Sequence, residues 1–159
     1  MRKAVFLDRD GLINRQAAPH HYISDPVDLE ILPGVPEAIK RLNDAGFLVI
    51  VVTNQRGVAR GMLTMEQVDA VHGYLQSELA KHGAHIDAIY VCPHADGECT
   101  CRKPDIGLFL MAEKDFDIDK SQSWMVGDSD TDVEAGKRYG VRTILTSSLP
   151  QAVNMILAG

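Results

Sequence analysis

Short apolar runs rich in β-branched residues alternate along this chain with longer segments in which apolar residues recur every three or four positions. The first pattern is typical of strands that are buried on both faces of a sheet, and the second of amphipathic helices. Strands that alternate with helices favour βαβ units, in which the strands run parallel. We therefore predict an α/β fold with a central parallel sheet.

The same pattern places the individual elements. Strands are expected at residues 4–7, 47–52, 86–91, 124–126 and 143–145. Helices are expected at residues 34–45, 65–82 and 107–116, in a segment that ends at 139, and from 150 onward. The expected core stripe of the second helix consists of Val68, Val71, Leu75 and Leu79.

Residues 14–33 show no clear periodicity and are too many for a plain connection, so we expect this segment to be functional or mobile. Its histidines, His20 and His21, are interpreted as solvated loop residues. Three further histidines lie on the second helix or just after it and are expected at the surface: His72, His82 and His85.

Length and composition are ordinary for a globular protein, with 159 residues of which 45% are hydrophobic and 24% charged. We expect one domain, residues 1–159. The net charge of −6 argues against nucleic acid or an acidic membrane as the main partner. No apolar run has bilayer length, and residues 1–3 lead into a strand rather than a signal peptide, so we expect a cytoplasmic protein. We also expect it to be a monomer.

Polar clusters follow the predicted strands or the loops that leave them. They are Asp8 with Asp10, Thr53 with Asn54, Arg102 with Lys103, and Asp128 with Asp132. In a parallel sheet the carboxyl ends of the strands lie along one edge, where ligands bind. The sequence therefore predicts a pocket at that edge that combines carboxylates with cations.

Carboxylates in such a pocket suit magnesium and phosphate chemistry. Asp8 and Asp128 supply hard oxygen ligands, and Mg²⁺ favours one or two carboxylates together with water and substrate phosphate. Asp8 is the candidate nucleophile because it leaves the rigid strand first, and carboxylates form aspartyl-phosphate intermediates. Asp10, two residues further on, is the candidate general acid and base.

Thr53 and Lys103 complete the expected catalytic set. Thr53 can donate a hydrogen bond to the transferred phosphoryl group, and Lys103 can neutralise the charge that develops on its oxygens. The alternative is an ordinary polar turn at Thr53 and a solvated lysine. Asp130 is interpreted as a first-turn acid of a helix, whereas Asp132 is expected either to orient the metal shell or to brace the lysine.

A second kind of site lies in the loop after the third strand, where the candidate ligands are Cys92, His94, Cys99 and Cys101. Three thiolates and one imidazole complete a tetrahedral zinc shell with no open position, so we expect a structural zinc ion. The loop leads directly into Arg102 and Lys103. Fixing the loop would therefore fix the two cations that hold phosphate.

Four segments together resemble the ordered motifs of the haloacid dehalogenase superfamily of phosphatases: Asp8-Arg9-Asp10-Gly11, Thr53-Asn54-Gln55, Arg102-Lys103-Pro104, and Gly127-Asp128 with Asp132. The resemblance implies a Rossmann-like three-layer sandwich with no large cap domain. It also implies that Asp8 is the nucleophile, that Asp10 is the acid and base, and that magnesium is held by Asp8, the carbonyl of Asp10 and Asp128. Contacts to substrate are expected from Asn54, Gln55, Arg60, Arg102 and Ser129.

The zinc loop is similar to that of the subgroup that contains heptose-bisphosphate and histidinol-phosphate phosphatases. Ala59-Arg60-Gly61 resembles the heptose pattern, whereas the short spacing from His94 to Cys99 is closer to the histidinol-phosphate pattern. We expect hydrolysis of the 7-phosphate of D-glycero-D-manno-heptose 1,7-bisphosphate, a precursor on the way to ADP-heptose and lipopolysaccharide, with histidinol phosphate as the alternative substrate.

Two interpretations from other classes remain open at this point. A phosphoacceptor signalling domain also carries an acidic cluster, a threonine and a lysine at its strand ends, although Asp10 and the zinc loop count against it. A zinc-stabilised binding module with an inactive site is the other interpretation, and it carries little weight because no catalytic residue is missing.

Overall fold

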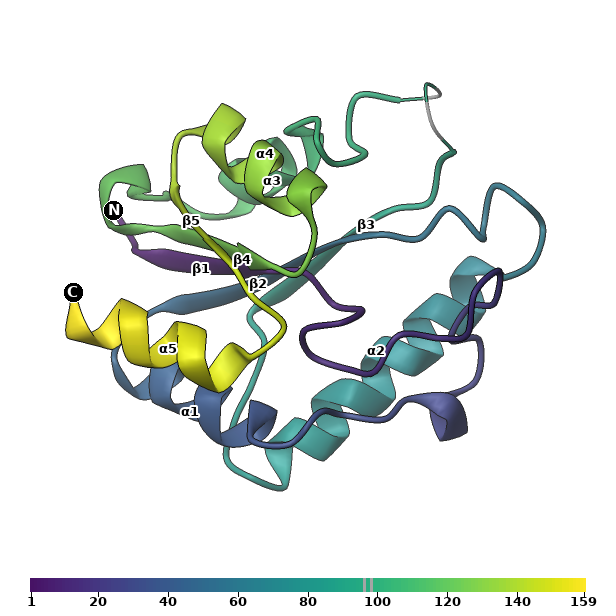
Figure 1. Ribbon diagram of the computed structural model, residues 1–159, viewed down its shortest axis with the longest axis horizontal. Helices are drawn as coiled ribbons and strands as arrows, with labels where there is room; N and C mark the ends of the chain where they lie inside the picture. Colours follow the sequence, from purple (N-terminus) through teal and green to yellow (C-terminus); the bar gives the residue numbers. More distant parts are fainter. Residues whose placement is uncertain (96, 98) are drawn as a thin grey trace.

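The computed structural model describes residues 1–95, 97 and 99–159. In these residues five strands form one parallel sheet in the order β3-β2-β1-β4-β5 (Figure 1). The strands are β1 (Ala4–Leu7), β2 (Leu48–Asn54), β3 (Ala88–Cys92), β4 (Trp124–Gly127) and β5 (Arg142–Leu145). The predicted parallel sheet is confirmed, and each strand lies within two residues of its expected position.

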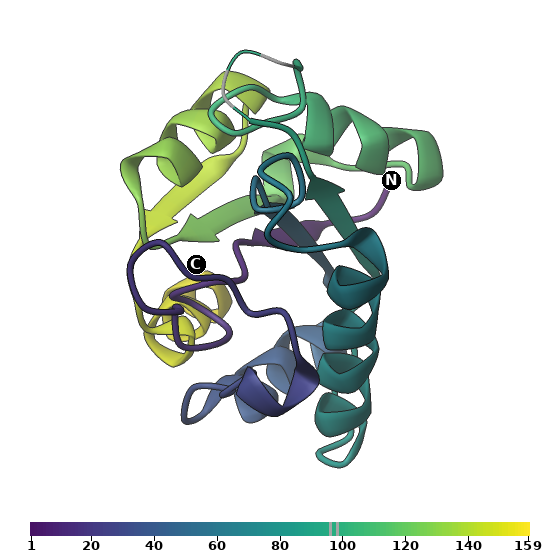
Figure 2. The ribbon, with the colours of Figure 1, turned by 90° about the vertical axis from the view of Figure 1, so that its right-hand side faces the viewer.

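Helices cover both faces of this sheet. They are α1 (Val35–Asp44), α2 (Met65–Ala80), α3 (Gly107–Asp115), α4 (Asp130–Tyr139) and α5 (Leu149–Ala158), with short 3-10 turns at Pro26–Asp28 and Lys120–Gln122. One face carries α1, α2 and α5, and the other carries α3 and α4 (Figures 1 and 2). The arrangement is the expected three-layer sandwich. In the described part of the chain, no helix combines the length and the apolar character needed to cross a membrane.

The side chains of the central strand β1 alternate between two apolar cores, as in any strand buried on both faces. Val5 and Leu7 belong to the core shared with α1, α2 and α5, whereas Phe6 belongs to the core on the side of α3 and α4. The ring centroid of Phe6 lies 4.9 Å from that of Phe109 and 5.8 Å from that of Tyr139. Packing on both faces makes the carboxyl end of β1 a rigid support for the residues that follow.

Helix α2 begins with a reciprocal cap. The hydroxyl of Thr64 accepts a hydrogen bond from the backbone N–H of Gln67, and the Gln67 side chain accepts one from the backbone N–H of Thr64. The predicted core stripe of this helix is buried along its whole length: Val68, Val71, Leu75 and Leu79.

The same buried face of α2 includes His72, which is only 8% exposed. The expectation that His72 lies at the surface is therefore wrong. His72 follows Val68 by four residues and precedes Leu75 by three, which places it on the stripe that faces the interior. His82 and His85 are exposed, as expected.

The order of the strands locates the ligand-binding edge. From β1 the chain extends the sheet to β2 and β3, and it then crosses to β4 and β5 on the other side. In open α/β sheets ligands bind beyond the carboxyl ends of the strands where this order reverses. Asp8, Thr53 and Asp128 all lie at this edge, at the ends of β1, β2 and β4.

Candidate active site

Lys103 and two aspartates form a buried ionic cluster at this edge. The Nζ atom of Lys103 lies 2.8 Å from Oδ1 of Asp8 and 2.6 Å from Oδ1 of Asp132. Burial alone would lower the pKa of Lys103, but the charges of the two aspartates outweigh it and raise that pKa. Lys103 is therefore held as a cation, and Asp132 braces it, which is one of the two roles expected for Asp132.

A third carboxylate, from Asp128, completes an acidic group. One oxygen from each of Asp8, Asp128 and Asp132 lies within 4.8 Å of the others. Gly11 turns the chain beside them with a φ of +87°, and a Cβ at this position would overlap Oδ2 of Asp128. Only glycine satisfies both the backbone conformation and the close approach. Nε2 of Gln16 donates a 3.2 Å hydrogen bond to the same Oδ2 atom.

The charge of Lys103 does not balance this group of carboxylates. Burial, opposed only in part by Lys103, raises the pKa of Asp8 to about 7. Burial together with the charge of Asp132 raises the pKa of Asp128. A cation between Asp8 and Asp128 would stabilise both in their ionised form, and carboxylate oxygens are the ligands that Mg²⁺ prefers. The donor set therefore fits a magnesium ion where the sequence predicts one.

Asp10 is held by an asymmetric set of hydrogen bonds. Its Oδ1 atom accepts from Nε of Arg9 at 3.0 Å, from Nη2 of Arg9 at 2.8 Å and from Nδ2 of Asn14 at 2.9 Å. Its Oδ2 atom accepts from Nε2 of Gln55 at 3.0 Å. Burial alone would raise the pKa of Asp10, but the charge of Arg9 and these hydrogen bonds lower it. Asp10 is thus ionised and fixed in one orientation.

Gln55 connects Asp10 to Thr53. Its Nε2 atom also donates to Oγ1 of Thr53 at 3.0 Å. The threonine oxygen accepts in this bond, so its own proton is available for a phosphoryl oxygen. Both side chains are almost fully buried. Gln55, which we expected to contact substrate, therefore holds Asp10 and Thr53, two candidate catalytic residues, in fixed positions relative to each other.

Asn54 binds the backbone of Lys103 with both ends of its amide. Nδ2 of Asn54 donates to the carbonyl oxygen of Lys103 at 3.2 Å, and Oδ1 accepts from the Lys103 N–H at 3.1 Å. In the sheet, Asn54 is also the register partner of Cys92. The amide that we expected to contact substrate therefore positions the lysine.

Ser129 and Asp130 lie where β4 leads into α4. The Ser129 hydroxyl donates to Oδ2 of Asp132 at 2.9 Å, so this residue, which we expected to contact substrate, supports the brace of Lys103. Asp130 is exposed at the first position of α4, as expected for a first-turn acid.

A pocket of about 330 Å³ opens beside this cluster, with walls that include Asp10, His20, His21, Tyr22, Gln55, Arg60 and Arg102. The Tyr22 ring lies against Gly57, where a Cβ would approach three ring atoms to 2.9 Å. The Tyr22 hydroxyl accepts a 3.1 Å hydrogen bond from Nη1 of Arg60. Arg60 and Arg102, which we expected to contact substrate, line this pocket together with His20 and His21.

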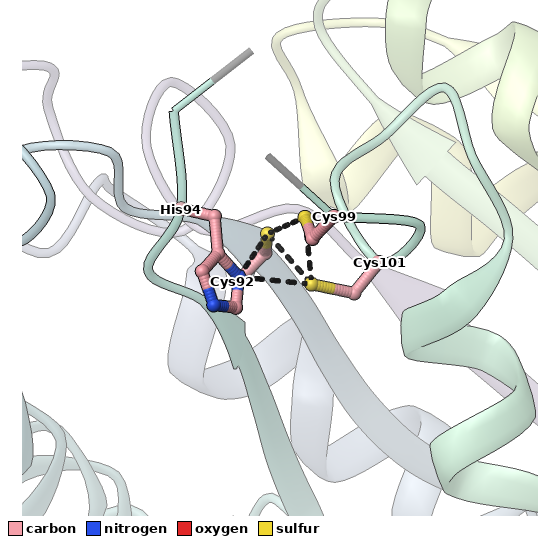
Figure 3. Close-up of side chains that lie close together, drawn as sticks. All are labelled: Cys92, His94, Cys99 and Cys101. Atoms are coloured by element: carbon pink, nitrogen blue, oxygen red, sulfur yellow. Dashed lines mark hydrogen bonds between the residues drawn. The ribbon is translucent and has the colours of Figure 1, made fainter. Parts of the chain in front are cut away.

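The four predicted zinc ligands converge at the end of β3, where one donor atom from each lies within 4.8 Å of the others (Figure 3). Sγ of Cys101 is 2.8 Å from Sγ of Cys92 and 3.2 Å from Sγ of Cys99, and Nδ1 of His94 is 3.5 Å from Sγ of Cys101. Burial raises the pKa of Cys92, and burial with the adjacent thiols raises that of Cys101. A divalent cation would offset the repulsion among three thiolates, so this donor set fits zinc.

The functional assignment from sequence missed several side chains that hold the site. Arg9 lies between the two candidate catalytic aspartates in sequence, yet it is 1% exposed and its Nη1 atom lies 3.1 Å from Nε2 of His72. The spacing of His72 from Val68 and Leu75 was the sequence signal that could have placed it on the buried face of α2. Asn14 and Gln16 lie in the irregular segment after Asp10, where no periodicity indicates direction.

Comparisons with known proteins agree with this geometry. A family model described as HAD-hydrolase-like matches residues 100–148. A D-glycero-beta-D-manno-heptose-1,7-bisphosphate 7-phosphatase from Haemophilus ducreyi is 42% identical over 150 residues, which cover 89% of this chain and 81% of that protein. The protein of the same name from Rhodopseudomonas palustris is 42% identical over 148 residues, with coverage of 88% and 81%.

A solved structure leads to the same group. The D,D-heptose 1,7-bisphosphate phosphatase of B. bronchiseptica, complexed with magnesium and phosphate, has a TM-score of 0.84 and 30% identity, with coverage of 98% of each chain. The chain therefore belongs to the haloacid dehalogenase superfamily and, within it, to the family of the D-glycero-D-manno-heptose-1,7-bisphosphate 7-phosphatases. This membership confirms the predicted enzyme class, a phosphoric monoester hydrolase.

Proposed function

We propose that this chain removes the 7-phosphate of D-glycero-D-manno-heptose 1,7-bisphosphate, with magnesium and by way of a phosphorylated Asp8. The observation that carries the proposal is the position of Asp8. It follows the central strand, its carboxylate is hydrogen-bonded to the buried cation of Lys103, and the carboxylate of Asp128 lies beside it. This arrangement provides a rigid nucleophile next to a site for a divalent cation.

In this proposal Asp8, Asp128 and the carbonyl of Asp10 hold the magnesium ion. When bound, the ion neutralises charge on the phosphoryl oxygens and keeps the two carboxylates ionised. Lys103 adds a fixed positive charge from the protein, and the Thr53 hydroxyl donates to a phosphoryl oxygen.

The reaction runs in two steps. First, a carboxylate oxygen of Asp8 attacks phosphorus, the bond between phosphorus and the ester oxygen breaks, and the leaving alcohol takes a proton from Asp10. Second, water gives a proton to Asp10 and attacks the phosphorylated Asp8, which releases inorganic phosphate and restores both carboxyl groups.

The environment of Asp10 suits both of these roles. Its lowered pKa makes it the ionised base that the second step needs. The negative charge of a bound phosphate raises the pKa of a neighbouring carboxyl, which favours the protonated form of Asp10 in the first step.

The choice of substrate is supported by the relatives, which carry the heptose-bisphosphatase name at 42% identity. It is also supported by Ala59-Arg60-Gly61 and by the pocket of about 330 Å³, a volume suited to a small ligand. Arg60 and Arg102 line this pocket, and two guanidinium groups suit a second phosphate on the same molecule. The alternative substrate, histidinol phosphate, has no comparable support among the named relatives.

We infer further that the Cys92 cluster holds a structural zinc ion, since its four donors leave no position for substrate. The enzyme is also proposed to act as a monomer.

Phosphate release from the heptose bisphosphate and from histidinol phosphate tests the proposal. We expect the higher kcat/KM on the bisphosphate, and turnover with Asp8→Asn at least about 1,000-fold below the native rate because the nucleophile is lost. A preference for histidinol phosphate would reverse the choice of substrate. A long-lived phosphorylated protein without steady phosphate release would favour a signalling domain.

A further inference from the structure

The guanidinium group of Arg9 is buried next to Asp10, and Arg9 is not among the residues that line the pocket. Two of its nitrogens, Nε and Nη2, donate to Oδ1 of Asp10 at 3.0 and 2.8 Å. Its third nitrogen, Nη1, lies 3.1 Å from Nε2 of His72. The side chain is 1% exposed. A buried guanidinium is tolerated only when its donors have partners, so the histidine is part of what keeps Arg9 in place.

The geometry fixes the state of this histidine. Arginine has donors only, so the His72 nitrogen that faces it must accept the hydrogen bond. Nε2 of His72 therefore carries no proton, and the imidazole is neutral. Burial, together with the charge of Arg9, lowers the pKa of His72 to about 4, which agrees with this assignment. The packing of Val68 and Leu75 on either side along α2 brings the ring to this position.

The position of Arg9 affects the carboxylate of Asp10, the proposed proton-transfer group. Oδ1 of Asp10 accepts three N–H groups, two of which come from Arg9. Among the described residues, Oδ2 accepts one, from Gln55. A proton on Oδ1 would face three N–H groups that already donate to this atom, whereas Oδ2 has a free lone pair that can accept a proton. The orientation of Arg9 thus determines which oxygen of Asp10 exchanges protons with the substrate.

We propose that His72 is a positioning residue for the phosphatase reaction, because its Nε2 atom fixes the Arg9 guanidinium that turns Oδ2 of Asp10 toward the leaving group. This inference rests on the proposed function, in which Asp10 protonates the leaving alcohol. Without the acceptor at residue 72, Nη1 of Arg9 lacks its buried partner, the guanidinium rotates, and the carboxylate of Asp10 loses its fixed orientation.

Two esters separate this role from a general structural one. The heptose bisphosphate has an alcohol leaving group that needs a proton, whereas p-nitrophenolate, the leaving group of p-nitrophenyl phosphate, departs without one. In His72→Leu we expect kcat/KM to fall about 10- to 100-fold on the sugar phosphate and less than about threefold on the aryl ester. The ratio kcat/KM reports the formation of phosphorylated Asp8, and in that step only the sugar phosphate needs the acid.

Two amide variants serve as a matched pair if the leucine variant fails to fold. His72→Gln places a carbonyl oxygen near the position of Nε2, whereas the side chain of His72→Asn is too short to reach Arg9. We expect glutamine to restore the activity on the sugar phosphate and asparagine to lose it as leucine does. His82→Gln, in an exposed histidine just beyond the same helix, is the control and should keep the native ratio of activities.

The outcomes are distinct. Equal losses on both esters, or no loss on the sugar phosphate in a folded His72→Leu or His72→Asn variant, would overturn the positioning role while leaving the proposed function intact. Failure of the native chain to release phosphate from either ester would reject the proposed function, and the inference with it.

Discussion

Asp132 accepts a 2.6 Å hydrogen bond from Nζ of Lys103, and both side chains are buried. Without Asp132, Lys103 keeps its contact to Asp8 but loses a second buried carboxylate. Breaking a buried ion pair costs about 3 to 5 kcal/mol, and the remaining contact places this case at the lower end. We therefore expect Asp132→Ala to lower the free energy of unfolding by about 3 kcal/mol and to reduce kcat, as measured by urea denaturation and phosphate release. Asp130→Ala, an exposed carboxylate two residues away, should stay within about 0.5 kcal/mol of the native chain. Equal stability of the two variants would contradict the bracing role.

Gly11 and Gly61 offer a matched pair of glycines. Both have positive φ, +87° and +71°, but a Cβ would overlap Asp128 at Gly11 and would meet nothing within 4 Å at Gly61. Each change to alanine should cost about 1 to 2 kcal/mol of backbone strain. Only Gly11→Ala should also displace a metal ligand, so we expect a higher magnesium concentration for half-maximal activity in this variant alone. The same magnesium dependence in both variants would place the effect in the backbone rather than at Asp128.

Because the imidazole of His72 is buried and neutral, we expect the chain to lose stability in acid. Burial and the charge of Arg9, opposed by Asp10, lower the pKa of His72 to about 4 in the folded chain from an ordinary value of 6.5. Between these two values the unfolded chain binds a proton that the folded chain does not, so acid favours unfolding. Above about pH 6.5, His72 does not reduce the free energy of unfolding. As the pH falls to about 4, its protonation in the unfolded chain lowers this free energy by roughly 3 kcal/mol.

Urea unfolding of the native chain and of His72→Gln between pH 7 and pH 4.5 measures this contribution. The variant lacks the titrating ring, so its stability should fall less steeply over this interval, whereas the carboxylates contribute equally to both proteins. Parallel curves would show that His72 titrates in the folded chain as it does in the unfolded one.

The thiol cluster predicts that metal content, stability and activity change together. Cys101→Ser removes a donor that lies 2.8 Å from Sγ of Cys92. We expect this variant to lose its bound zinc, as measured by metal analysis, and to lose more than about 2 kcal/mol of stability because ligand binding and folding are coupled. Its activity should fall as well, since Lys103 follows the loop by two residues. Thr100→Ala, at an exposed neighbouring position, should leave all three properties unchanged.

The fold was predictable because its signals are local. β1 and β2 are buried on both faces, and such strands consist of near-continuous apolar runs that are easily recognised in a sequence. The place of Asp8, Thr53 and Asp128 at one edge of the sheet was equally predictable, since these residues lie at strand ends whose direction the parallel sheet determines.

The contacts among side chains could not be predicted from the sequence in the same way. The sequence marks Asn54 and Gln55 as polar residues at a strand end, which suits substrate contact and structural support equally well. Their partners, the backbone of Lys103 and the carboxylate of Asp10, are 49 and 45 residues away. His72 is the exception, because its spacing from Val68 and Leu75 carried the information.

The two hydrogen bonds from Asn54 to the Lys103 backbone make the cysteine-bearing loop a closed unit. Asn54 is the register partner of Cys92, at the start of the loop, and its side chain holds Lys103, at the end. One residue of β2 thus fastens both ends of the segment between them. As long as the four donors keep their metal, the segment between His94 and Cys99 can therefore change in length or composition without moving Lys103.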